Sequence, residues 1–410
     1  MNEFLIGPFA QVLTMNRLPL DGPLLDSQLE ILTDAGVVIR DGVIREIGRY
    51  NDLSKRPLPR HEIATPTVLL PGFVDAHTHI CFAGSRARDY ALRLSGLTYQ
   101  EIAAKGGGIQ DTVRYTRAAS SHELEESLVA RTKRLLARGV TTCEVKSGYG
   151  LSIEEEIKIL EVIDRVGKSQ PITLVPTCLA AHVRPPEFDS NSEYLTYIIE
   201  GLLPQVIQRN LSRRVDIFVE KGAFFPEESL IYLKAAAKMG FDICIHADQF
   251  SRGGAQLAAE VGALSADHLE QSLEEDFEAL KKSGTFPIVL PGASMGLGMP
   301  YAPARQILNL GLPLVIASDW NPGSAPMGYL LAEAALMGMA EKLTIAETFA
   351  AITVRASRAL RLTDRGTLTV GQRADMVGFP TGNYQEILYY QGSLQPSLVY
   401  ANGQPIYNDI

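Results

Sequence analysis

The segment Pro71-Gly72-Phe73-Val74-Asp75-Ala76-His77-Thr78-His79 carries the strongest local signal in the chain. It continues an apolar run that predicts a buried strand over Val68–Ala76. Side chains at i and i+2 of an extended chain point the same way, so His77 and His79 are expected to converge on one point. Two imidazoles that share a metal ion need this placement. Taken alone, the pair is equally compatible with two ordinary histidines, and the rest of the chain decides between these interpretations.

Apolar runs alternate with amphipathic helical stretches through the middle of the chain. Continuous apolar strands that alternate with helices indicate a parallel sheet buried on both faces. Eight such units predict an α/β fold with a (β/α)8 TIM-like barrel, and an open doubly wound sheet is the structural alternative. The strands expected after the first are Thr141–Lys146, Ile172–Ala181, Val215–Val219, Phe241–His246, Ala263–His268, Phe286–Leu290 and Leu314–Ser318. The helices expected between them include Glu123–Ala137, Ile153–Val166, Glu227–Lys238 and Gly254–Val261.

Both ends of the chain carry β-hairpin patterns. Asp41-Gly42 near the start and Asn402-Gly403 near the end lie between β-branched or aromatic runs, and such dipeptides are typical of two-residue hairpin turns. Further short strands are expected at 366–371 and 374–379. We therefore predict one small β-sandwich domain built from residues 1–64 and 363–410, beside a metal-dependent barrel over residues 65–362.

The composition is that of an ordinary globular protein, with 46% hydrophobic and 21% charged residues in a chain of 410. A net charge of -9 argues against a general binder of nucleic acid or anionic membranes. We see no signal peptide and no apolar run long enough for a membrane helix. The four cysteines form no CxxC pair, which favours a cytoplasmic setting. Gly106-Gly107-Gly108 lacks the Lys-Ser/Thr that would follow in a phosphate loop.

Most of the seven histidines stand at the C-terminal end of a predicted strand, and the eighth strand ends in Asp319. The catalytic side chains of a barrel gather at that end, whereas histidines without a function would be scattered, as His61 and His122 are. Three imidazoles and a carboxylate suit Zn²⁺ or Fe²⁺ better than Mg²⁺ or Ca²⁺. The five histidines in question are His77, His79, His182, His246 and His268.

This arrangement resembles the amidohydrolase superfamily and, within it, the imidazolonepropionase family. The resemblance covers nearly the whole chain. Its narrower strings are Gly84-Ser85-Arg86, Lys105-Gly106-Gly107-Gly108-Ile109, Glu144-Val145-Lys146-Ser147-Gly148-Tyr149-Gly150, Ser265-Ala266-Asp267-His268-Leu269 and Asp319-Trp320-Asn321-Pro322-Gly323-Ser324.

The resemblance implies one metal ion per chain, Zn²⁺ or Fe²⁺/Fe³⁺, held by His77, His79, His246 and Asp319. It implies hydrolysis of the ring C–N amide bond of 4-imidazolone-5-propanoate to N-formimidoyl-L-glutamate in histidine degradation. A metal-activated water would attack the ring carbonyl. Asp319 would then move the water proton to the leaving nitrogen, and His268 would hydrogen-bond the developing oxyanion.

The substrate's propanoate calls for a planar cation, and Arg86 fits this need by bidentate pairing. Tyr149 and His182 are expected to contact the ring or the carboxylate. Gln249 stands where some members of the family carry Glu; it cannot ionise, so it would orient substrate or water and leave the proton work to Asp319. Hydrogen bonds at the product end are expected from Asn321, Gly323 and Ser324, although Asn-Pro-Gly-Ser is also ordinary turn chemistry.

Three alternatives stay open at this point. A deaminase acting on a purine, pyrimidine or related ring would share the metal site and differ around Arg86 and Tyr149. A carboxylated Lys146 bridging two metals is a competing scheme for the site. A non-catalytic barrel relative would be expected to lack metal ligands, and this chain has a full set. The family resemblance also suggests a homodimer.

Overall fold

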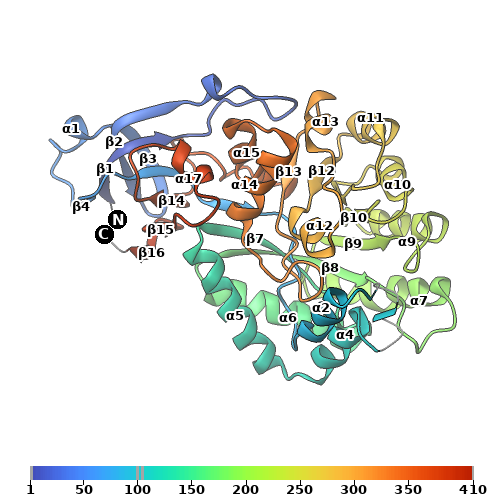
Figure 1. The fold of residues 1–410 in the computed structure, drawn as a ribbon. Helices are drawn as coiled ribbons and strands as arrows, with labels where there is room; N and C mark the ends of the chain where they lie inside the picture. The colour runs from blue at the N-terminus through green and yellow to red at the C-terminus, as the bar shows by residue number, and fades with distance from the viewer. Residues whose placement is uncertain (1–2, 98–100, 103–105, 409–410) are drawn as a thin grey trace.

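The computed structural model describes residues 3–97, 101–102 and 106–408, so Lys105 of the glycine-rich string lies outside the described residues. In this part of the chain, eight parallel strands form a barrel with each strand beside its successor in sequence (Figure 1). The predicted (β/α)8 barrel is thereby confirmed. Its strands are β6 (Phe73–Asp75), β7 (Val140–Lys146), β8 (Thr173–Ala181), β9 (Arg214–Val219), β10 (Asp242–Ala247), β11 (Ser265–His268), β12 (Phe286–Val289) and β13 (Val315–Ile316).

Helices cover the outside of the barrel, including all four that the sequence predicted. In α5, Ser120 accepts a hydrogen bond from the Glu123 backbone N–H, which satisfies a donor at the helix start. The longer helices are α5 (Ser121–Ala137), α6 (Ile153–Ser169), α9 (Pro226–Lys238), α10 (Gly254–Val261), α11 (Glu274–Ser283) and α14 (Leu330–Glu341). The others are α2 (Ala87–Leu94), α4 (Ile109–Ala118), α7 (Asn191–Tyr197), a π-turn Ile198–Leu202, α8 (Leu203–Gln208), α12 (Pro291–Leu297), α13 (Ala304–Asn309), α15 (Ile345–Ala351) and α16 (Val354–Ala359).

The barrel closes between β6 and β13, just beyond the ends of both strands. The Asp319 N–H donates to the His77 carbonyl at 3.0 Å, and the His79 N–H donates to the Trp320 carbonyl at 2.9 Å. Thr78 and Trp320 form a parallel bridge between them. The backbone that carries three predicted ligands is therefore fixed by the seam itself.

A second sheet, in the order β16-β15-β14-β5-β1-β2-β3 with β4 beside β1, joins the two ends of the chain (Figure 1). Both predicted hairpins are present, and both central residues of each turn have positive φ, at Asp41-Gly42 and Asn402-Gly403, as type I′ turns require. Its strands are β1 (Glu3–Leu13), β2 (Ile31–Arg40), β3 (Val43–Arg49), β4 (Arg60–Glu62), β5 (Val68–Pro71), β14 (Met376–Phe379), β15 (Leu398–Ala401) and β16 (Gln404–Asn408). Short helices lie at Asp26–Gln28, α1 (Tyr50–Leu53) and α17 (Gln385–Tyr389).

Two strand predictions were wrong. The expected strand Val68–Ala76 is two strands, because β5 pairs with β1 and β14 of the second sheet whereas β6 belongs to the barrel. Gly72 lies between them, and a Cβ there would come within 2.3 Å of Thr141 Oγ1. Residues 366–371 are not a strand but a loop, tied to the second sheet by single backbone hydrogen bonds such as Leu368 N–H to Thr14 O. The domain boundaries stay a prediction.

The described helices include none with the length and apolarity needed to cross a bilayer. All four cysteines are buried, and none forms a disulfide in the described structure.

Candidate metal centre

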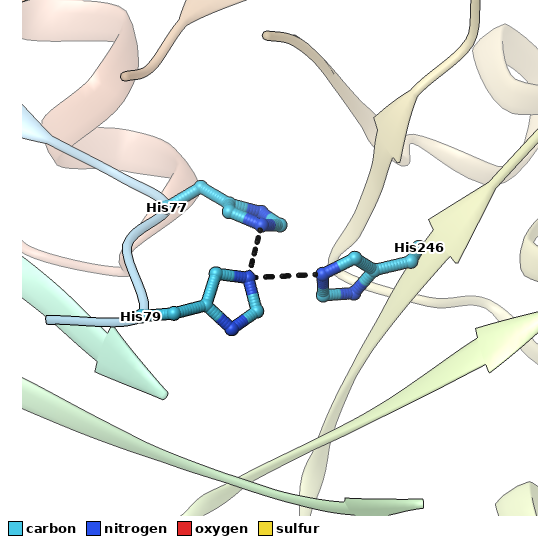
Figure 2. Close-up of side chains that lie close together, drawn as sticks. All are labelled: His77, His79 and His246. Atoms are coloured by element: carbon cyan, nitrogen blue, oxygen red, sulfur yellow. Dashed lines mark hydrogen bonds between the residues drawn. The ribbon is translucent and has the colours of Figure 1, made fainter. Parts of the chain in front are cut away.

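Three histidines, two from the segment just after β6 and one from β10, point at one another at the C-terminal mouth of the barrel (Figure 2). His77 Nε2 lies 3.2 Å from His79 Nε2, which lies 3.3 Å from His246 Nε2. Asp319 Oδ1 completes the group, at 3.5 Å from His77 Nε2 and 3.3 Å from His79 Nε2. All four side chains are buried. The structure thus brings together the four ligands that the resemblance implied.

The donor set fits a transition-metal ion. With metal–ligand distances of about 2.0–2.1 Å, neighbouring ligands of a tetrahedral site are about 3.4 Å apart, close to the spacing seen among these atoms. Burial, with added repulsion from Lys146 and His246, lowers the pKa of His77 to about 4. Burial also lowers the pKa of His79 and His246. Neutral imidazoles are the form that binds a metal.

Carboxylates behind the site orient two of the histidines. His77 Nδ1 lies 2.6 Å from Asp267 Oδ2, and His246 Nδ1 lies 3.0 Å from Asp216 Oδ2. Because Nδ1 of each ring faces a carboxylate, its proton is placed there and Nε2 keeps its lone pair for the metal. Sequence reasoning missed Asp216 and gave Asp267 no role. The available signal was an acidic residue inside an otherwise apolar strand.

Lys146 lies in the same buried layer and contacts both of these carboxylates. Its Nζ is 2.7 Å from Asp216 Oδ2, 2.8 Å from Glu144 Oε1 and 3.7 Å from Asp267 Oδ2. Burial alone would lower the pKa of Lys146, but the surrounding carboxylates outweigh it and raise the pKa. Carboxylation requires a neutral amine, so the geometry disfavours a bridging role for this lysine.

A cavity of about 620 Å³ opens above the metal ligands. Two of the predicted site residues, His77 and Gly323, are not among those that line it. Gly323 lies beneath Arg86, and a Cβ there would be 2.2 Å from Arg86 Nη1. The predicted residues that line the cavity are His79, Arg86, Tyr149, His182, His246, Gln249, His268, Asp319, Asn321 and Ser324.

Tyr149 and His182 form one wall of the cavity. The His182 ring stacks on His79 with centroids 5.4 Å apart, and Tyr149 lies at the same distance from His182. His182 Nδ1 is 3.0 Å from the Gly148 carbonyl oxygen, so it carries the proton and donates. The Nε2 atom of His182 is therefore an acceptor.

His268 lies on the opposite side of the metal ligands, with its ring centroid 5.4 Å from that of His246. Its φ of +88° is unusual for a residue with a side chain, and such strained positions cluster at functional sites. Burial by itself would lower the pKa of His268, but the nearby Glu270 and Asp319 raise it. His268 Nδ1 lies 3.7 Å from Glu270 Oε2.

Asn321 closes the turn after the eighth strand. Its Oδ1 accepts from the Gly323 and Ser324 N–H groups at 2.7 and 2.8 Å, and its Nδ2 donates to the Asp319 carbonyl at 2.7 Å. The turn chemistry expected of Asn-Pro-Gly-Ser is present. These bonds fix the backbone next to the Asp319 ligand.

The loop that carries Gln249 is held by Glu220, which sequence reasoning missed. Glu220 Oε2 accepts from the Phe250 and Ser251 N–H groups at 2.8 and 3.2 Å. Its Oε1 accepts from the Lys221 N–H at 2.8 Å. Both carboxylate oxygens accept hydrogen bonds from the loop, so Glu220 fixes it, and Glu220 lines the cavity together with Gln249.

Glu333 of α14 is a buried carboxyl group whose ionisation is expected to make the stability of the protein depend on pH. Burial, together with the charge of Asp75, raises the pKa of Glu333 well above its usual value. The unfolded chain ionises this group near pH 4.5, so above that pH the unfolded state binds fewer protons and stability falls as pH rises. Glu333→Gln is expected to reduce the fall in unfolding free energy between pH 5 and 8, measured with urea. An exposed control, Glu154→Gln, is expected to leave the slope unchanged; an unchanged slope in Glu333→Gln would contradict the prediction.

Residues 68–406 match the model of the amidohydrolase family. The chain is 41% identical over 399 residues to the imidazolonepropionase of Symbiobacterium thermophilum, covering 95% of this chain and 94% of the relative. It is 38% identical to the imidazolonepropionase of Bdellovibrio bacteriovorus, covering 94% and 92%.

Solved structures of low sequence identity share the fold. A triazine hydrolase from Arthrobacter aurescens superposes with a TM-score of 0.76 at 16% identity, covering 100% of this chain and 95% of the other. An adenosine deaminase from Xanthomonas campestris with bound zinc gives 0.74 at 18% identity, covering 99% and 93%. At these identities the likeness concerns the fold alone.

Proposed function

The chain belongs to the amidohydrolase family and, within it, to the imidazolonepropionases, and from this premise we propose how its residues divide the work. It is a hydrolase of histidine degradation that opens a cyclic amide C–N bond, that of 4-imidazolone-5-propanoate, to give N-formimidoyl-L-glutamate. The observation that carries the proposed site is the convergence of three Nε2 atoms and one Asp319 oxygen beneath a cavity that Arg86 also lines.

We propose that His77, His79, His246 and Asp319 hold one Zn²⁺ or Fe²⁺/Fe³⁺ ion per chain. When bound, the metal supplies Lewis-acid activation of a water near neutral pH. The imidazole and carboxylate donors accept both metals, so metal analysis of the purified protein decides between them. Two ions per chain would overturn the mononuclear site.

The protein groups then handle protons and charge. Asp319 accepts the proton of the attacking water and delivers it to the ring nitrogen as the C–N bond breaks. His268 donates a hydrogen bond to the carbonyl oxygen as negative charge develops on it. Gln249 has no ionisable proton, so its amide orients the water or the ring while Asp319 does the proton transfer.

The remaining contacts hold the substrate. Arg86 pairs with the propanoate carboxylate, and Tyr149 with His182 contacts the ring. Hydrogen bonds to the product end are proposed from the turn of Asn321, Gly323 and Ser324, of which Asn321 and Ser324 line the cavity and Gly323 does not. Of these, Asn321 acts mainly by shaping the turn, because its side-chain oxygen already accepts two backbone N–H groups.

The direct test follows imidazolone propanoate by its ultraviolet absorbance, with and without a chelator. We expect consumption that stops on chelation and returns when Zn²⁺ or Fe²⁺ is added back. Turnover of cytosine or guanine with imidazolone propanoate untouched would replace this proposal with a ring deaminase.

Arg86→Ala is expected to raise KM for imidazolone propanoate by about thirtyfold, since a buried charge pair is worth about 2 kcal/mol or more, and to change kcat little. Steady-state kinetics measure both. Arg114→Ala removes an exposed arginine of α4 that does not line the cavity, and it is expected to change neither constant. An unchanged KM in Arg86→Ala would remove Arg86 from the binding site.

We further propose that the enzyme works in the cytoplasm as a homodimer and binds no nucleic acid, in line with its family and its net charge of -9. Light scattering of the purified protein measures the oligomeric state. A monomer over the micromolar range would exclude the dimer.

A further inference from the structure

Two segments that are close in sequence and a third about 200 residues later meet at one wall of the cavity. The segments are α2, the glycine-rich stretch before α4, and the turn after β13. Asp89 of α2 joins the first two, since its Oδ2 accepts from Arg86 Nε at 2.8 Å and from the Gly108 N–H at 2.9 Å. The Asp89 side chain is only 4% exposed. One buried carboxylate oxygen therefore ties the carboxylate-binding arginine to the glycine-rich stretch.

Glycine is sterically required at two positions around this pair. A Cβ at Gly107 would lie 2.4 Å from Asp89 Oδ1, and one at Gly323 would lie 2.2 Å from Arg86 Nη1. Real Cβ atoms do not approach other atoms so closely, so a side chain at either position would displace the pair. The glycine at position 107 is thus explained by the space that Asp89 occupies.

The ion pair has a defined effect on Arg86. A guanidinium has five N–H donors in a rigid plane, and fixing Nε on one carboxylate fixes the plane for the others. Arg86 lines the cavity, and Arg93 of the same helix donates to the Gly323 carbonyl at 2.9 Å, which fixes the backbone on which Arg86 packs. Before substrate binds, the Arg86 guanidinium is therefore held at Nε by Asp89 and packs against the backbone of Gly323.

We propose that Asp89 is a positioning residue that presents the Arg86 guanidinium to the substrate's carboxylate, with Gly107 and Gly323 as specificity-determining positions that leave room for the pair. The inference rests on the proposed function, because it takes the propanoate as the ligand of Arg86. Preorganisation lowers the entropy lost when the carboxylate binds, and this gain outweighs the repulsion between Asp89 and the carboxylate. The site thereby selects ring substrates that carry an anionic tail.

The test compares two stable probes with the metal-loaded protein by titration calorimetry, imidazole-4-propanoate and its neutral propanamide. We expect Asp89→Ala to weaken binding of the acid at least about tenfold, with amide binding unchanged within about twofold. The kcat for imidazolone propanoate is expected to stay within about threefold while KM rises. A merely structural defect would weaken both probes together.

Two further variants separate the orienting effect of Asp89 on Arg86 from the effect of its negative charge. Asp89→Asn keeps an oxygen that accepts from Arg86 and Gly108, so we expect acid binding within about threefold of the wild type. Gly107→Ala keeps Asp89 but takes its space, and we expect the same selective loss as in Asp89→Ala. If Asp89→Ala does not fold, Gly107→Ala decides the question. Asp111→Asn, in another Asp–Arg pair three residues apart on α4 whose residues do not line the cavity, is the matched control.

The outcomes are distinct. Equal losses for both probes, unchanged acid binding, or tighter acid binding in Asp89→Ala each overturn the inference while leaving the proposed function in place. A wild-type protein that does not hydrolyse imidazolone propanoate contradicts the proposed function instead. A wild type that hydrolyses it but binds the acid no better than the amide removes the carboxylate role of Arg86, and the inference with it.

Discussion

A His246→Ala protein is expected to lose its metal, from about one ion per chain to less than about one tenth, and with it at least about a thousandfold in activity. The reason is geometric, because His246 is the only one of the three described histidine ligands that reaches the site from the far side of the barrel, from β10. The two ligands on the β6 side and Asp319 form the other half of the site. Metal analysis of the purified variant and the ultraviolet assay measure the two losses.

The matched control for this variant is His122→Ala. His122 has an 80% exposed side chain on α5, so its removal is expected to change neither metal content nor activity. A His246→Ala protein that kept a full metal content would exclude His246 as a ligand. If metal content fell but the rate per bound ion stayed unchanged, the ligand role of His246 would stand. Only the predicted additional loss of activity would be contradicted.

Lys146→Met is the second change with a large expected effect. It leaves Glu144, Asp216 and Asp267 buried without their cation, and breaking a buried pair in this way costs about 3–5 kcal/mol of stability. Because Asp216 and Asp267 face the Nδ1 atoms of two histidines of the proposed metal site, we also expect metal affinity to fall about 10- to 100-fold. Urea unfolding measures the first effect, and competition with a chromogenic chelator measures the second.

Lys168→Met supplies the comparison, since Lys168 has a 74% exposed side chain that pairs with Asp164 on the surface. Exposed pairs contribute about 0–1 kcal/mol, and this one lies on the outside of α6. If Lys146→Met lost stability but bound metal as tightly as the wild type, the lysine would act on folding alone. An unchanged stability would mean that the three carboxylates do not depend on it.

The barrel and the clustering of its histidines were predictable because their signals are local. His77 and His79 follow one apolar run, the other barrel histidines each follow another, and a parallel barrel brings the ends of those runs together. The hairpins were equally accessible, since Asp41-Gly42 and Asn402-Gly403 adopt the positive φ values that such dipeptides favour.

The features that could not be predicted from the sequence depend on contacts between residues distant in the chain. The first strand breaks at Gly72 because β5 pairs with β1 and β14 whereas β6 pairs with β7, and nothing near Gly72 in the sequence indicates these partners. Asp216 and Asp89 look like ordinary acidic residues until their partners are known. For Asp216 the partner is His246, 30 residues away, and for Asp89 it includes the Gly108 N–H on the next segment.

The seam between β6 and β13 also determines when, during synthesis of the chain, the barrel can close. Asp75 accepts two hydrogen bonds from Ser318, 243 residues later, so this closure waits for most of the polypeptide to leave the ribosome. A nascent chain that ends before Asp319 has neither the seam nor the fourth ligand. An ion held by the proposed four-ligand site would therefore stabilise only the completed barrel.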